Sequence, residues 1–258
     1  MKIGLIEYTQ NAKELLIFTK NTRHLSSDAR FEDVLDLTDR QKDEQLSYVF
    51  GTIGSAWEFV NYTFLIQDVT RSFTHQMVRH RAGTAFAQQS LRVASVDDFR
   101  YFIPDKIEKD VYLSTYFENA MGDSSEWYEQ LLKKGADQQD ARGVLPINIC
   151  TNILVKMNLR ALSHLMETRL CIRAQGEFQE VALTMKGLVS DVHPWADDVL
   201  NPCCVLHGYC PWRNFTECPI KKKYNHLWPP DKKLNCEVKN DWEVLMLNKY
   251  SPQPEQSK

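Results

Sequence analysis

The sequence predicts an α+β protein in which a central antiparallel or mixed sheet is flanked by helices. Residues 2–8 are a short apolar segment typical of a strand, and residues 59–70 are rich in the β-branched and aromatic side chains that favour strands. Apolar residues of the segment 178–189 recur at helical spacing, which indicates an amphipathic helix. No internal repeat or low-complexity linker divides the chain. We therefore expect one domain over residues 1–200 and an irregular, cysteine-containing extension over residues 201–258.

The middle of the chain predicts three further elements. Residues 74–80 are expected to form a helix and residues 93–101 a strand that ends before a proline. The run Asp123-Ser124-Ser125 offers side chains that can cap a helix. This helix is expected to continue to about residue 141 and to bury Trp127, Leu131 and Leu132.

The segment after residue 141 predicts a long helix that starts at Pro146. Its residues Ile149, Ile153, Met157 and Arg160 follow one another at helical spacing. The pattern weakens beyond Pro194, and the last eight residues, 251–258, are expected to be disordered because they are polar and lie at a terminus.

Composition indicates a globular protein rather than a nucleic-acid-binding or membrane protein. Of the 258 residues, 43% are hydrophobic and 25% are charged, which is ordinary for a globular chain. The net charge of −3 gives no global positive field for a nucleic acid. No apolar run approaches the roughly 20 residues of a membrane span, and the N-terminus becomes charged too early for a signal peptide. We expect a cytoplasmic location, which would be the host cytoplasm if the chain is encoded by a virus.

The seven cysteines are expected to be reduced thiols. Their number is odd and no secretory signal precedes them, which favours a reducing compartment. Four of them, Cys203, Cys204, Cys210 and Cys218, gather near the C-terminus around His207. No Cys-x-x-Cys pair is present, so we expect no metal site, and a zinc site stays open as the alternative.

A run of cations, Arg79-His80-Arg81, is the strongest indication of a ligand site. Guanidinium groups stay charged at any working pH and match phosphate oxygens in bidentate pairs. Residues 82–89, which follow, are mostly small or polar, so a ligand can approach the backbone, and they lead into Ser90-Leu91-Arg92. An apolar helix rarely ends in three cations unless an anion meets them. The pattern predicts a phosphate-bearing ligand, and the alternative is a solvated basic turn.

The stretch from Arg79 to Arg92, RHRAGTAFAQQSLR, resembles the signature of the flavin-dependent thymidylate synthases, the ThyX family. The signature is Arg-His-Arg, seven or eight residues, then Ser, usually followed by x-Arg. A second block over residues 139–182 supports the resemblance, through Asp140-Ala141-Arg142, Leu145-Pro146, Asn158-Leu159-Arg160, Arg169 and Arg173-Ala174-Gln175-x-Glu177. A weaker match is Ser55-Ala-Trp-Glu58, followed by Asn61-Tyr62-Thr63-Phe64. The resemblance covers roughly residues 50–220, and the first fifty residues match poorly.

The resemblance implies a ThyX-like fold and the reductive methylation of dUMP to dTMP. It implies FAD as the cofactor, with NADPH as the reductant and methylenetetrahydrofolate as the carbon donor. No Gly-x-Gly-x-x-Gly motif is present, so the FAD pyrophosphate would need another site, and Arg79-His80-Arg81 is the best candidate. The resemblance also implies a homotetramer whose active sites lie at subunit interfaces.

Residue roles follow from the same resemblance. Cofactor binding is implied for Ser55, Glu58, Arg79, His80 and Arg81. Contacts with dUMP are implied for Gln76, Arg79, Gln88, Gln89, Ser90, Arg92 and Arg169.

Arg169 and Ser90 are the catalytic candidates among these residues. Arg169 would lie against the pyrimidine carbonyl, where a fixed cation stabilises charge pushed into the ring. Ser90 has no adjacent His–Asp pair to activate it, so we interpret it as a hydrogen-bonding residue. Arg92 would bind the substrate phosphate.

Each role has a structural alternative. Arg169 could pair with Glu167 or Glu177, His80 could be a packing histidine, and Glu58 could cap a helix. Four positions depart from the family pattern, namely Ile53, Phe59, Val93 and Gly176.

Two other functions therefore stay open. One is a flavin-dependent pyrimidine nucleotide hydroxymethylase of the same fold, in which water rather than hydride ends the reaction. The other is a non-catalytic nucleotide-binding protein that uses the basic cluster.

Overall fold

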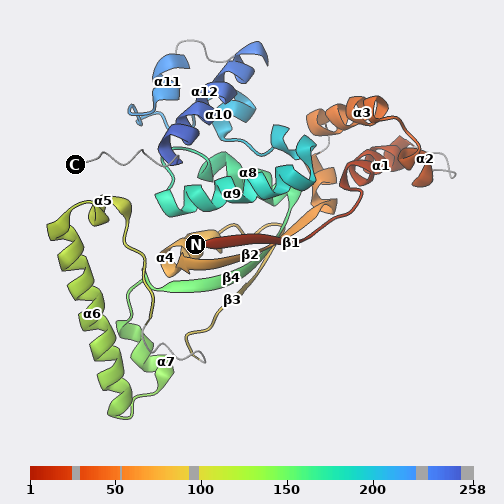
Figure 1. Cartoon of the computed structure of the whole chain (residues 1–258). Coiled ribbons are helices and arrows are strands. Elements are labelled where there is room, and N and C mark those ends of the chain that lie inside the picture. Colours follow the sequence, from red (N-terminus) through yellow and green to blue (C-terminus); the bar gives the residue numbers. More distant parts are fainter. Residues whose placement is uncertain (25–29, 53, 93–98, 225–231, 251–258) are drawn as a thin grey trace. The chain divides into compact units, whose positions relative to one another are not determined.

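The computed structural model describes residues 1–24, 30–52, 54–92, 99–224 and 232–250. It combines a four-stranded sheet with helices, so the predicted α+β class is confirmed (Figure 1). Among these residues, no helix is both long enough and apolar enough to cross a membrane.

The chain divides into two compact units, which we call the sheet unit and the helical unit. The sheet unit consists of Met1–Tyr8 and Asn61–Met157, and the helical unit consists of Thr9–Val60 and Asn158–Lys258. The elements of the sheet unit, in chain order, are β1 (Lys2–Tyr8), β2 (Asn61–Thr70), α4 (Arg71–Met77), β3 (Thr84–Gln88), α5 (Asp105–Glu108), α6 (Val111–Lys133), α7 (Gln138–Ala141), the 3-10 helix η2 (Arg142–Val144) and β4 (Cys150–Asn158), whose last residue already counts with the helical unit.

The sheet has the strand order β1-β2-β4-β3. Strands β1 and β2 pair antiparallel, as do β3 and β4. Buried side chains alternate along the two central strands, with Tyr62, Phe64 and Ile66 on β2 and Ile153 and Val155 on β4. Such alternation is the signature of a strand with one buried face. The expected strands at residues 2–8 and 59–70 are thus confirmed as β1 and β2.

The long helix expected from Pro146 is wrong, because this segment forms strand β4 and helix α8 starts only at Leu159. A spacing of four residues fits both a helix and alternate positions of a strand, so Ile149, Ile153 and Met157 could not decide between them. The intervening residues decide, because Thr151 and Val155 are buried as well. A period of two then fits the whole segment.

The expected cap at Asp123 is also wrong, since this residue lies inside α6. The helix begins earlier because the Asp110 carboxylate accepts hydrogen bonds from the backbone N–H groups of Tyr112 and Leu113, at 3.0 and 3.1 Å. Trp127 was expected in the core but is 65% exposed. Tyr128 takes its place in a small core with Leu131 and Leu132 partly buried against it, as expected for the two leucines.

Two other expectations in this unit are partly met. The helix expected over residues 74–80 runs from Arg71 to Met77, because the Thr70 hydroxyl accepts a hydrogen bond from the Phe73 N–H and caps it. Residues 93–98 of the strand expected over 93–101 lie outside the described residues. Tyr101 forms an isolated antiparallel bridge with Ile149.

The helical unit contains all the remaining elements. In chain order they are α1 (Ala12–His24), α2 (Glu32–Leu35), α3 (Asp39–Thr52), η1 (Gly54–Phe59), α8 (Leu159–Arg169), α9 (Gly176–Val192), η3 (Pro194–Asp198), α10 (Cys203–His207), α11 (Pro219–Tyr224) and α12 (Lys232–Tyr250). Helix α9 confirms the amphipathic segment expected over residues 178–189. The expected disorder of residues 251–258 lies outside the described residues.

The C-terminal extension is more regular than expected, because it forms the helices α10, α11 and α12. On α12 the side chains of Val238, Trp242 and Met246 are buried at a spacing of four residues. The indole N–H of Trp242 donates a hydrogen bond to the backbone carbonyl of Leu170 at 3.1 Å. This contact ties α12 to the end of α8.

A buried charge network joins α9, η3 and α12. The Lys186 ammonium is 2.9 Å from the Asp197 carboxylate and donates to the Asn201 side-chain oxygen at 2.7 Å. Lys239 contacts the other carboxylate oxygen of Asp197 at 2.6 Å. Burial alone would raise the pKa of Asp197, but hydrogen bonds from Lys239 and Lys186 bring it below its ordinary value of 3.8. Burial lowers the pKa of Lys186.

Asp197→Asn should lower the free energy of unfolding by about 1.5–3 kcal/mol at pH 7, because Lys186 loses its charged partner. The folded-state pKa of Asp197 is depressed, so the stabilisation is complete above about pH 3.8 and is lost as the pH falls through the folded value. Urea titrations at several pH values should therefore show a difference in the free energy of unfolding between wild type and variant, and this difference should narrow below this pH. Asp198→Asn is the control, since its side chain is 79% exposed and 3.9 Å from Lys239. A difference in unfolding free energy that does not depend on pH would contradict a stabilising role of the ionised Asp197 carboxylate.

Candidate functional site

The basic run lies in the turn between α4 and β3 of the sheet unit. Arg79 and Arg81 are exposed, and His80 is half-buried. Helix α4 ends at Met77, so the cations follow a helix C-terminus, where positive charge is favoured by the helix dipole. An anion bound here is attracted by the side chains and not by the helix end.

The Thr84 hydroxyl holds this turn in shape. It donates to the carbonyl of His80 at 2.6 Å and lies 3.2 Å from the carbonyl of Arg81. Gly83 precedes it with φ of 69°, a left-handed conformation that glycine adopts without a steric penalty. The Arg79 guanidinium lies 3.4 Å from the Nε2 atom of His75, one α4 turn earlier. No role of His75 was expected from the sequence.

The glutamines and the serine that follow the turn are positioned by neighbouring elements. The Gln88 side chain donates to the Thr74 hydroxyl at 2.9 Å, which connects β3 to α4. The Gln89 carbonyl accepts a hydrogen bond from the Arg71 guanidinium at 2.7 Å. The Ser90 hydroxyl oxygen accepts a hydrogen bond from the Arg92 N–H at 3.2 Å. Ser90 and Arg92 are both exposed, so their side chains are accessible to a ligand.

A cavity of about 410 Å³ lies beside these residues and was not expected from the sequence. Its lining includes Arg71, Leu91 and Arg142. Burial and the charge of Arg142 lower the pKa of Arg71, so the two cations repel each other in the absence of an anion. The Nε atom of Arg71 is buried and has no hydrogen-bond partner among the described residues. An anion in the cavity would reduce the repulsion between the two arginines and accept a hydrogen bond from the Arg71 Nε atom.

The signal for Arg71 was weak. It is an isolated cation two residues before the buried Phe73, and no neighbouring cation marks it as part of a basic run. Arg142 belonged to a recognised motif, but no role was assigned to it.

Ser55 and Glu58 lie on η1 of the helical unit, and each contacts an arginine. The Arg23 guanidinium donates to the Ser55 hydroxyl oxygen at 2.9 Å. The Glu58 carboxylate pairs with Arg160 at 2.6 Å. Glu58 is therefore part of an ion pair, and both partners are more than half exposed.

Arg169 is the last residue of α8, whose first turn carries Arg160. The Asn158 side chain caps this helix by accepting a hydrogen bond from the Ala161 N–H at 2.8 Å. Nine residues of helix separate the two arginines by about 13 Å along the axis, so Glu58 and Arg169 belong to opposite ends of α8.

The Arg169 guanidinium lies over the Phe178 ring, 4.3 Å from its centroid. Burial lowers the pKa of Arg169. A guanidinium held over a ring can still donate hydrogen bonds from its N–H groups to a carbonyl. The sequence offered Glu167 and Glu177 as ion-pair partners of Arg169. Of these two carboxylates, Glu167 contacts His207 at 3.4 Å.

The predicted site residues thus fall into two sets. The sheet unit brings together Gln76, Arg79, His80, Arg81, Gln88, Gln89, Ser90 and Arg92 around α4 and β3. The helical unit holds Ser55, Glu58 and Arg169.

The chain matches the family described as Thymidylate synthase complementing protein over residues 4–195. The match includes all the predicted site residues, and it begins well before residue 50, where the resemblance had been expected to start. A flavin-dependent thymidylate synthase of Pyrococcus furiosus is 32% identical over 241 residues, covering 88% of this chain and 96% of the relative. A relative of the same name from Clostridium tetani is 32% identical and covers 82% and 90% of the two chains. Another from Nitratidesulfovibrio vulgaris is 40% identical, covering 60% and 66%.

Thr84→Val should loosen the basic turn with little loss of global stability, about 0.5–1.5 kcal/mol for one hydroxyl hydrogen bond. Hydrogen exchange measured by mass spectrometry should show faster exchange confined to a peptide spanning residues 79–84. Thr115→Val is the matched control, because the Thr115 hydroxyl donates to the Val111 carbonyl on the exposed helix α6. Unchanged exchange in Thr84→Val would show that the hydroxyl does not hold the turn.

Proposed function

Because the chain belongs to the Thymidylate synthase complementing protein family, we propose that it is a flavin-dependent thymidylate synthase. The reaction is the reductive methylation of dUMP to dTMP, which makes the protein a methyltransferase. The observation that carries this conclusion is the family match across residues 4–195, together with relatives of nearly full length that bear this name. The basic turn and Arg169 supply the chemistry that the reaction requires.

The cofactor is FAD, with NADPH and methylenetetrahydrofolate as co-substrates. FAD, once reduced, supplies the hydride that no protein side chain can provide. The donor set fits such a group, because exposed arginines in a shaped turn can neutralise a diphosphate without a glycine-rich loop. Arg79, His80 and Arg81 would hold the pyrophosphate, and Ser55 and Glu58 are proposed as further cofactor contacts.

The dUMP phosphate is assigned to the arginine cavity of the sheet unit. Arg71 and Arg142 both line it, and the unpartnered Nε atom of Arg71 is a donor available to a phosphate oxygen. Ser90 and Arg92 flank Leu91, which lines the same cavity, and are proposed as further phosphate contacts. Gln76, Gln88 and Gln89 complete the nucleotide site in this proposal.

Arg169 is proposed to lie beside a carbonyl of the pyrimidine ring. The methylation requires C5 of the ring to act as a nucleophile, which pushes negative charge toward a carbonyl oxygen. A guanidinium held on the Phe178 ring is preorganised to stabilise that charge in the transition state. Ser90 would act as a hydrogen-bonding residue and not as a nucleophile.

We also propose a homotetramer with active sites at subunit interfaces. Helix α6 supports this, because it exposes large apolar side chains that a partner subunit would cover. Val111, Tyr112 and Tyr116 are 77%, 80% and 74% exposed, and Trp127 is 65% exposed. Several large exposed apolar side chains on one helix are typical of an interaction site.

The domain boundary and the location are further proposals. The catalytic domain would comprise residues 1–200 and the extension residues 201–258. None of the described cysteines forms a disulfide, which supports a reducing compartment such as the cytoplasm.

The decisive experiment begins with the visible spectrum of the purified full chain, which should show bound flavin. Incubation with dUMP, methylenetetrahydrofolate and NADPH should then yield dTMP. A hydroxymethylated nucleotide, with dUMP or dCMP as substrate, would identify the hydroxymethylase instead. Protein that stays colourless after FAD is added and gives no product would identify a non-catalytic binder.

Arg169→Ala should reduce turnover by about 10²–10³, the usual effect of losing one preorganised charge. Flavin content should stay at the wild-type level, because the pyrophosphate is assigned to the basic turn. Arg213→Ala, in the C-terminal extension, is the control and should be fully active. A folded Arg169→Ala protein without flavin would contradict the assignment.

Arg142→Gln should weaken dUMP binding at least about 30-fold, because a buried phosphate loses one charged partner worth about 2 kcal/mol or more. Titration of the flavin absorbance with dUMP measures this directly. The same titration with deoxyuridine, which lacks the phosphate, should show little difference between variant and wild type. Arg40→Gln on α3 is the control, since its side chain is 90% exposed. An equal loss for both ligands would place Arg142 outside the phosphate site.

A further inference from the structure

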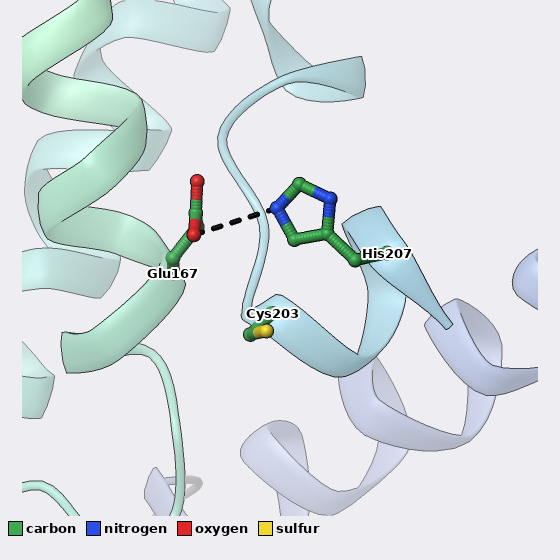
Figure 2. Close-up of side chains that lie close together, drawn as sticks. All are labelled: Glu167, Cys203 and His207. Carbon is green, nitrogen blue, oxygen red and sulfur yellow. Dashed lines mark ion pairs between the residues drawn. The ribbon is translucent and has the colours of Figure 1, made fainter. Parts of the chain in front are cut away.

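Three metal-ligating side chains meet in the helical unit, and none of them is assigned to the flavin or nucleotide site (Figure 2). Glu167 comes from the last turn of α8, and Cys203 and His207 come from α10. One ligand atom of each residue lies within 4.8 Å of those of the other two. Cys203 and His207 are four residues apart on a helix, so their side chains share one face. Figure 2 shows this face turned toward the Glu167 carboxylate.

The donor types are those of a zinc site. Zinc binds thiolate sulfur, imidazole nitrogen and carboxylate oxygen at about 2.0–2.3 Å, in tetrahedral geometry. Two nitrogen or oxygen ligands of such a tetrahedron lie about 3.4 Å apart. The Nε2 atom of His207 is 3.4 Å from an Oε2 atom of Glu167. The pair therefore already has the separation that a shared zinc ion requires.

The adjoining cavity is large enough for an ion and too small for an organic ligand. It has a volume of about 30 Å³, and one water-sized probe needs about 10–15 Å³. Glu167 and Cys203 both line it, whereas His207 does not, and four further thiols line it as well, those of Cys171, Cys204, Cys210 and Cys218. Apolar side chains, among them Trp212, form much of the remaining wall and would limit access of water to the metal.

We propose that Glu167, Cys203 and His207 bind one Zn²⁺ ion. The ion joins the end of α8 to α10 and so anchors the C-terminal extension. This goes beyond the proposed function, since neither flavin nor nucleotide is involved. The competing explanation is a simple ion pair between protonated His207 and Glu167, which needs no sulfur. An exposed pair of this kind contributes little to stability, and Cys203 distinguishes the two explanations.

The test uses the full chain, stripped of metal with a chelator under reducing conditions and then titrated with Zn²⁺ against a chromophoric competitor. We expect about one tightly bound ion per chain. Cys203→Ser, His207→Asn and Glu167→Gln should each weaken binding more than about 100-fold, because loss of an outer-shell partner alone already costs 10–100-fold. Cys236→Ser and His164→Asn are matched controls, since both residues are exposed and lie outside the cluster. Their affinity should equal that of wild type.

Cobalt substitution provides a second readout. Co²⁺ bound to the wild-type chain should give a thiolate charge-transfer band in the near ultraviolet, which Cys203→Ser should weaken or shift and Cys236→Ser should leave unchanged. Zinc should also raise the melting temperature of the wild type but not of His207→Asn, which covers the case that Cys203→Ser fails to fold. Absence of tight binding, or equal affinity in wild type and the folded ligand variants, would overturn the proposal. Because flavin content and dTMP formation are measured separately, failure here is distinguishable from failure of the proposed function.

Discussion

The helical unit depends on the way helix α8 is held at both ends. The Asn158 cap fixes where the helix begins, and the Glu58–Arg160 ion pair braces its first turn. At the other end, the Trp242 indole binds the Leu170 carbonyl just after the helix. A helix fixed at its two termini has a defined length and rotation, so its last residue, Arg169, has a defined position. The accuracy of a catalytic charge depends on such support, because preorganisation means that no reorientation remains to be done.

Positive charge in this chain is accommodated in three distinct ways. Lys186 is buried and its charge is balanced within the fold by Asp197. Arg169 is partly buried and rests on an aromatic ring. Arg71 is neither balanced nor fully solvated, and it faces a second arginine across a cavity. Lys186 thus serves the structure, whereas the proposed anionic ligand would balance the charge of Arg71. The unsatisfied Nε atom of Arg71 supports the proposed phosphate site because a second cation lines the same cavity.

Much of this arrangement follows from local sequence, and the rest depends on tertiary contacts. Strand β2 and helix α9 were predictable because each shows one clear period of apolar residues. Strand β4 was not, because a spacing of four residues satisfies both a strand and a helix. The basic turn was visible as a run of neighbours. The pairing of Glu167 with Cys203 and His207 was not visible, because Cys203 lies 36 positions after Glu167 in the sequence, on another helix.

The two explanations for Glu167 differ in what they imply for Arg169, two residues further along α8. As a simple ion pair, the Glu167 carboxylate contacts one nitrogen atom of His207, at 3.4 Å. A metal ion would bind the carboxylate directly and hold it more firmly than such a pair. If the final residue of α8, Arg169, presents a fixed charge to the substrate as proposed, it would benefit from the metal-bound arrangement. The burial of Cys203 on this face of α10 would then be explained by its thiolate binding the metal.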